Sequence, residues 1–239
     1  MDRCRWATLM IIGFSLVLQG CGGIKIAYKM DDIPVNKVDA LSNMVLDVQV
    51  LEDNRKSLEE NQILFSGDKK AKIGDKTFCI NAEKHYDEGT VSNQVSKLIS
   101  EHLKKKETFK DVTFNKKEEA DVYLVGKLDR FYGQRDYSAA VTAALATGMA
   151  FGAIGGALSA LATLTKTSGE VEIDFKEAVL YKKDGSGIGR IEEINQKVEK
   201  KVRADGYCWS IYGAVNEELK TTVEKLSKEV ETVLLNSSN

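Results

Sequence analysis

The side chains in this 239-residue sequence that could carry chemistry include four cysteines and two histidines. A catalytic cysteine needs a base within hydrogen-bonding distance, and a metal site needs three or four ligands that converge on one point. Cys79 and Cys208 have no histidine near them in the sequence, and His85 and His102 belong to no metal-ligand spacing. The sequence therefore predicts no catalytic residue and no metal site, and we expect a protein that is not an enzyme.

Another cysteine, Cys21, stands at the end of a leader-like segment. Arg3 and Arg5 precede an apolar stretch at residues 7–17, and small residues follow it. This stretch is shorter than the roughly 20 apolar residues that a bilayer-spanning helix requires. Residues 1–20 therefore have the pattern of a signal peptide, which is removed on export.

The four residues Leu18-Gln19-Gly20-Cys21 resemble the bacterial lipobox. The resemblance implies cleavage between Gly20 and Cys21, a diacylglyceryl group on the Cys21 sulfur and an acyl chain on its new amine, with no other cofactor. Two or three acyl chains make a stable membrane anchor. By the sorting rule of Gram-negative lipoproteins, Gly22 in place of Asp implies the outer membrane, with the protein facing the periplasm. The alternative is an ordinary secretory signal in which the cysteine stands at this position by chance.

Charge and cysteine usage narrow the expected partners. A formal net charge of −2 gives no electrostatic reason to expect nucleic acid. In the oxidising periplasm, Cys79 and Cys208 either form a disulfide or stay as two small buried side chains, because sequence does not give the Cα separation that a bridge requires. The expected partners are membrane lipid through Cys21, and either further copies of this chain or another envelope protein.

Hydrophobic periodicity predicts strands and two helices after a lipid-anchored tether at residues 21–41. Apolar and polar residues alternate in the strands, so Leu46 and Val48 face away from Asp47 in the first strand. The helices carry an apolar stripe, and His102 falls on the more polar side of the first helix. The expected elements are a strand at 44–53, a hairpin within 63–73, a helix at 91–103, strands at 112–114, 122–131, 170–181 and 188–202, and a helix from residue 210.

These elements predict the fold class. Helices and sheets that each have one apolar face cover each other in two layers. We therefore expect a single α+β domain at residues 42–239, with an antiparallel or mixed β-sheet covered by two amphipathic helices. Residues 188–202 also fit a helical stripe, but the Asp-Gly-Ser-Gly turn before them favours a strand.

An insert at residues 138–164 interrupts this domain between two strands that are expected to be antiparallel neighbours. It contains no charged residue and is rich in alanine, and four-residue steps separate Gly148, Gly152 and Gly156. Such spacing lets another helix approach closely. We favour a helical hairpin that turns near Gly155 and Gly156 and that enters a membrane leaflet, packs on the domain or meets other copies. A single bilayer-spanning helix and a small hairpin buried within one subunit are the alternatives.

The order of the elements and two short motifs resemble the YajG-type outer-membrane lipoproteins. The motifs are Asp-Asn-Arg at residues 53–55 and the strand ADVYLVGKL at residues 120–128. The resemblance extends over about residues 18–235 and implies an outer-membrane lipoprotein without assigned catalytic residues. The Ala/Gly-rich insert departs from the family pattern.

Two functions are consistent with these observations. In the first, the protein is a structural or assembly lipoprotein that oligomerises or touches the membrane through its insert. In the second, it is a periplasmic binding or accessory module of a transport or envelope system, and the insert is internal packing.

Overall fold

The computed structural model describes residues 24–55, 64–65, 70–73, 76–81, 86, 89–137, 166–203 and 208–237. Outside the described residues lie the signal peptide with Gly20 and Cys21, the insert with Gly148, Gly152, Gly155 and Gly156, and His85. The described elements, in chain order, are β1 (Val45–Val48), β2 (Glu52–Asp53), β3 (Leu64–Phe65), β4 (Lys70–Ile73), β5 (Lys76–Ile80), α2 (Val91–Lys105), β6 (Asp111–Phe114), the 3₁₀ helix η4 (Lys117–Glu119), β7 (Val122–Asp136), β8 (Lys166–Lys182), β9 (Gly187–Arg190), β10 (Ile194–Arg203) and α5 (Trp209–Ser237).

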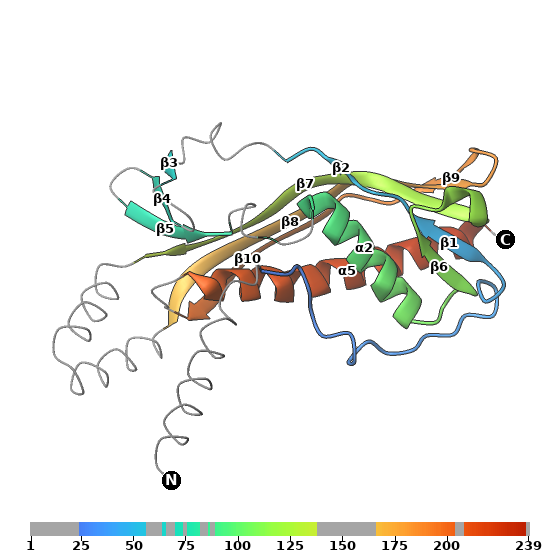
Figure 1. Ribbon diagram of the computed structural model, residues 1–239. Coiled ribbons are helices and arrows are strands. Elements are labelled where there is room, and N and C mark those ends of the chain that lie inside the picture. Colours follow the sequence, from blue (N-terminus) through green and yellow to red (C-terminus); the bar gives the residue numbers. More distant parts are fainter. Residues whose placement is uncertain are drawn as a thin grey trace, which may run out of the picture.

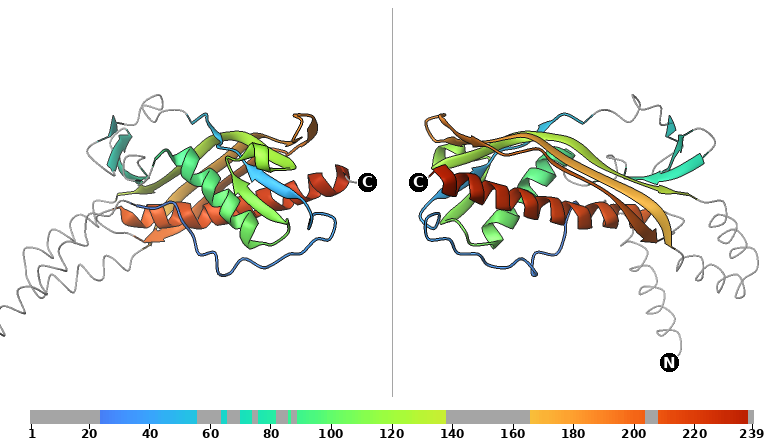
Figure 2. Two further views of the ribbon diagram at one scale, coloured as in Figure 1. Left: turned by 45° about the vertical axis from the view of Figure 1, so that its right-hand side comes forward. Right: turned by 180° about the vertical axis from the view of Figure 1, so that it is seen from behind.

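These elements form a two-layer α+β domain, as the sequence predicts. One layer is a mixed β-sheet built around β7 and β8. The other layer consists of α2 and α5, which cover the same face of the sheet (Figures 1 and 2). Neither these helices nor any other described helix is both long and apolar enough to cross a bilayer.

The centre of the sheet is the long antiparallel pair of β7 and β8. Their register runs from Val122 opposite Lys182 to Arg135 opposite Gly169. β9 and β10 pair with β8, both antiparallel. The expectation that antiparallel neighbours flank the insert is therefore confirmed.

The other side of β7 makes the sheet mixed. Its first half lies parallel to β1, which in turn lies parallel to β6. Its last residues pair antiparallel with β5, and β4 and β3 continue from β5 as an antiparallel hairpin. The short hairpin expected within residues 63–73 is thus the outer part of this β3–β5 extension.

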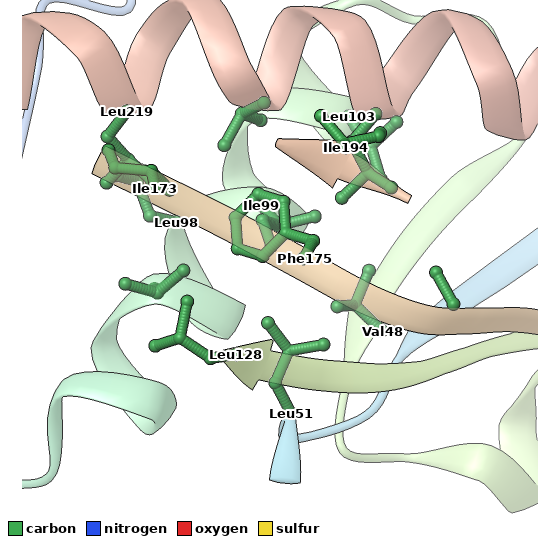
Figure 3. Packing of buried hydrophobic residues seen from close by; sticks show 14 of the residues in the cluster. Val48, Leu51, Leu98, Ile99, Leu103, Leu128, Ile173, Phe175, Ile194 and Leu219 are labelled. Carbon is green, nitrogen blue, oxygen red and sulfur yellow. The ribbon is translucent and has the colours of Figure 1, made fainter. Parts of the chain in front are cut away.

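The core lies between the sheet and the two helices (Figure 3). The predicted stripe of α5 is buried throughout: Ile211, Val215, Leu219, Val223, Leu226, Val230 and Leu234. Burial of such side chains stabilises the fold by about 1.5–3 kcal/mol each. β7 approaches α5 so closely at Gly133 that a Cβ atom there would lie 2.5 Å from a methyl group of Val215.

The helix α2 begins at Val91, as predicted, and ends two residues beyond the predicted end, at Lys105. The hydroxyl of Thr90 accepts a hydrogen bond from the backbone N–H of Asn93, which satisfies one of the free donors of the first turn. Lys104 and Lys105 lie in the last turn, where positive charge is favourable to the helix dipole.

The first strand differs from the prediction. It ends at Val48, and β2 follows only after a break in which Val50 is 36% exposed. Asp47 is fully buried rather than solvated, because it accepts hydrogen bonds from the Thr113 hydroxyl (2.7 Å) and the Lys116 backbone N–H (2.8 Å). The carboxylate thus ties β1 to the turn that follows β6.

Residues 188–202 are two strands rather than one. β9 stops at Arg190, and β10 begins at Ile194. Between them, Ile191 is buried and its backbone N–H donates to the Ala178 carbonyl at 2.8 Å. The chain therefore crosses from one β8 ladder to the next at this point, and the helical alternative is wrong.

The segment expected to be a tether packs along the domain over its described part, residues 24–41. Ile26, Ile33 and Leu41 are buried. This segment also covers His102, which is 1% exposed rather than on a solvated helix face, and whose Nδ1 lies 2.9 Å from the Tyr28 hydroxyl. Burial, with the nearby charge of Lys106 and Lys220, lowers the pKa of His102 to about 4.

Candidate functional site

The ends of four elements meet where the insert leaves the domain. We call this region the insert end and define it by Asp136 at the end of β7, Lys166 at the start of β8, Arg203 at the end of β10 and Trp209 at the start of α5. Lys166 is the register partner of Arg203, and adjacent strands lie about 5 Å apart. Figure 1 shows these four element ends together at the left of the domain. The two ends of the insert are thus joined to neighbouring strands.

A disulfide between Cys79 and Cys208 ties this end together. It joins the β5 hairpin to the residue before α5, with the two Cα atoms 5.2 Å apart. Both cysteines are fully buried. Of the two readings that the sequence left open, disulfide and separate thiols, the disulfide is the one observed.

A buried arginine lies against the disulfide. Arg135 is 1% exposed, and its guanidinium donates to the Cys79 sulfur at 3.0 Å and to the Asp136 carbonyl at 3.1 Å. The sequence did not point to it, because β7 continues through polar residues to Asp136 whereas its apolar alternation is clear only to about residue 131. These hydrogen bonds link the end of β7 to the disulfide-bonded end of β5.

The start of the described chain lies beside the first turns of α5. Ile24 forms a parallel bridge with Tyr86, whose ring contacts that of Tyr212 at a centroid distance of 5.3 Å. Asn216 donates a hydrogen bond to the Lys25 carbonyl at 3.1 Å. The segment that follows Cys21 is thereby fixed to the same part of α5 that borders the insert end.

A second polar cluster joins the two helices. The Lys106 ammonium donates to the Glu231 carboxylate at 2.5 Å and to the Ser227 hydroxyl at 2.8 Å. Thr108 and Asn36 also donate to Glu231, at 3.2 Å and 3.1 Å. Because these side chains bond to one another across three elements, the cluster holds α2, α5 and the N-terminal segment together.

A third cluster lies on β7, β8 and the segment before β10. The Lys176 ammonium is 3.0 Å from Asp129, 3.3 Å from Asp174 and 3.5 Å from Glu193. Burial raises the pKa of Asp174, whereas the bond to Lys176 lowers that of Asp129. Two carboxyl groups with separated pKa values can act as acid and base. Here the ammonium bonds to both, which makes the group an ion-pair network.

The predicted site residues separate into two groups. Cys79 and Cys208 come together at the insert end, whereas Cys21 and the glycines of the insert lie outside the described residues. Within the described part of the chain, no three His, Cys, Asp or Glu side chains are placed to hold a metal ion. A shallow depression between the start of β10 and α5 is lined by Glu192, Glu193, Ile194, Asn195, Lys225, Lys228 and Glu229.

Comparison with known proteins shows a distant structural likeness. No protein-family model matches the chain, and no curated protein matches it. The crystal structure of protein XCC0632 from Xanthomonas campestris, of family model DUF330, superposes with a TM-score of 0.46 and 10% sequence identity. The superposition covers 87% of this chain and 96% of that one. The resemblance to YajG-type lipoproteins stays a prediction.

Proposed function

We propose that this chain is an outer-membrane lipoprotein, held by acyl chains on Cys21, whose periplasmic domain has a structural or assembly role. The observation that carries the proposal is the lipobox-like sequence at residues 18–21, which follows a basic and apolar leader. Ile24, three residues after Cys21, is already bridged to Tyr86. Since three extended residues span about 10 Å, the domain would stand directly on the membrane.

The same proposal gives the insert its role, which is contact with the bilayer or with other copies of the chain. A charge-free stretch of this length is unsuited to full exposure to water. A single straight helix of 27 residues would separate its ends by about 40 Å. The pairing of Arg135 with Gly169 brings the flanking strands together instead. This pairing supports a hairpin, whose two ends lie on the same side of the membrane. It does not support a single helix that crosses the membrane once.

Anchoring is tested by replacing Cys21 with alanine in cells fed labelled palmitate. We expect the wild-type chain to be labelled and to fractionate with the outer membrane. The Cys21→Ala chain is expected to carry roughly a tenth of the wild-type label or less. Cys4→Ala is the matched control, because Cys4 lies in the same leader but outside the lipobox-like sequence. A Cys21→Ala chain that is labelled and fractionates like the wild type would contradict the proposal.

The role of the insert is tested by deleting residues 139–163 and closing the gap with an Asn-Gly turn. Because β7 and β8 are antiparallel neighbours, a tight turn can replace the insert without changing the sheet. We expect thermal unfolding within a few degrees of the wild type, together with loss of the oligomers that chemical cross-linking traps in native membranes. Unchanged cross-linking would favour the accessory-module alternative. A large loss of stability would show that the insert is internal packing.

A further inference from the structure

The last residue pairs between β8 and β10 place positive charge on the sheet face that the helices do not cover. Lys166 and Arg203 are register partners, and Lys201 lies two residues before Arg203 on the same face. All three side chains are exposed, whereas Val202 between the last two is buried. Like charges directly opposite each other destabilise a sheet. An anion that lies against Lys166 would offset this repulsion.

The cations further along β10 are arranged differently. Lys197 lies 3.2 Å from Glu170, and Lys200 lies 2.9 Å from Glu218. Lys166 and Lys201, in contrast, have no carboxylate of any described residue within ion-pair distance. Among the described residues, carboxylates thus pair with the lysines in the middle of the strand but not with Lys166 or Lys201.

An exposed tryptophan lies near the end of β10. Trp209 is 47% exposed at the start of α5, and the hydroxyl of the next residue, Ser210, donates to the Arg203 carbonyl at 2.6 Å. The ring centroid of Trp209 lies 6.3 Å from that of Tyr212, which contacts Tyr86, the partner of Ile24. Tryptophan side chains favour the boundary between lipid headgroups and acyl chains.

We propose that the insert end is a lipid-contacting surface, in which Trp209 enters the headgroup boundary while Lys166, Lys201 and Arg203 face anionic phospholipid headgroups. The inference rests on the proposed function, which brings the membrane to this end through the acylated Cys21 and the charge-free insert. The surface itself consists only of described residues of the domain. Its effect is orientation: the insert end faces the bilayer, and the turn between β8 and β9 points away from it. Attraction between basic side chains and anionic headgroups acts only within a Debye length of the surface.

The test uses the tryptophan as a natural probe. Trp6 lies in the leader, so Trp209 is the sole tryptophan of the processed chain. The purified lipoprotein is reconstituted into vesicles of phosphatidylethanolamine and phosphatidylglycerol whose acyl chains are brominated near the headgroup. We expect bromolipid to lower the Trp209 emission at least twofold and to protect it from acrylamide in the water.

Two sets of variants make the test specific. In Trp209→Phe/Tyr181→Trp, the probe moves to the opposite end of β8, and we expect bromolipid to leave its emission unchanged. Replacing Lys166, Lys201 and Arg203 by glutamine is expected to halve the bromolipid quenching of Trp209. The matched control replaces three exposed cations of the opposite end, Lys182, Lys183 and Arg190, and is expected to leave the quenching unchanged.

The outcomes separate this inference from the proposed function. A chain that does not float with the vesicles contradicts the lipid anchor. A chain that floats but whose Trp209 is quenched by acrylamide and not by bromolipid overturns the lipid-contacting surface while the anchor stands. If neither acrylamide nor bromolipid quenches Trp209, the lipid-contacting surface is overturned as well, because a second copy of the chain would then cover this end. Equal loss of quenching in both cation triplets contradicts the role of Lys166, Lys201 and Arg203.

Discussion

Replacing Cys79 and Cys208 by serine is expected to lower the free energy of unfolding by about 4–5 kcal/mol. The disulfide joins residues that are 129 positions apart, and in the chain-entropy model a crosslink across so long a loop removes much of the freedom of the unfolded chain. Urea denaturation of the processed chain, with and without a thiol reductant, measures the change. The reduced wild-type chain should unfold at the same urea concentration as the double serine variant.

The loss should also be visible locally at the insert end. The disulfide attaches β5 to the start of α5, and the other strand pairings of β5 are with the last residues of β7 and with β4 of its own hairpin. We therefore expect amide hydrogen exchange in residues 76–80 to become faster in the serine variant than exchange in residues 122–131, which stay paired with β8. Equal urea midpoints for the oxidised and reduced wild-type chain would contradict this account.

The elements with strong periodicity were predictable from the sequence. The stripe of α5, the Thr90 cap of α2 and the alternation in β7 and β8 each depend on residues that are close in the chain. The same local patterns led to the two-layer α+β fold. The break between β9 and β10 was missed, because Ile191 is apolar and fits the periodicity although it crosses between two ladders.

The buried polar residues were not predictable from local patterns. His102 and Asp47 occupy positions that a helix or strand alone would leave in water. Tyr28, which covers His102, is 74 residues away in the sequence, and Thr113, which bonds to Asp47, is 66 residues away. Burial of such groups follows from long-range packing and from partners that satisfy their hydrogen bonds.

The candidate site shows the same limit. The sequence drew attention to Cys21 and to the insert, because a lipobox and a charge-free stretch are local signals. The pairing of Lys166 with Arg203 depends on the register between β8 and β10, and the position of Trp209 depends on where α5 begins. A surface assembled from three remote strand and helix ends carries no motif that a sequence could reveal.

Replacing Lys106 by methionine is expected to destabilise the protein by about 3–5 kcal/mol. Lys106 and Glu231 are each 8% exposed, and removal of the ammonium leaves a buried carboxylate without its counter-charge. Thr108 and Asn36 still donate to Glu231, but neutral donors replace only part of the charge interaction. Urea denaturation at neutral pH measures the loss.

A double replacement and an exposed ion pair serve as controls for this prediction. Lys106→Met combined with Glu231→Leu should recover most of the lost stability, because two apolar side chains of similar size leave no buried charge. Lys104 lies two residues away and pairs with Asp111 at 2.8 Å, but both side chains are largely exposed. Lys104→Met should therefore cost less than about 1 kcal/mol. If the single Lys106 and Lys104 variants lost equal stability, the buried cluster would not be what holds α2 to α5, and the apolar contacts between the layers would have to carry that role alone.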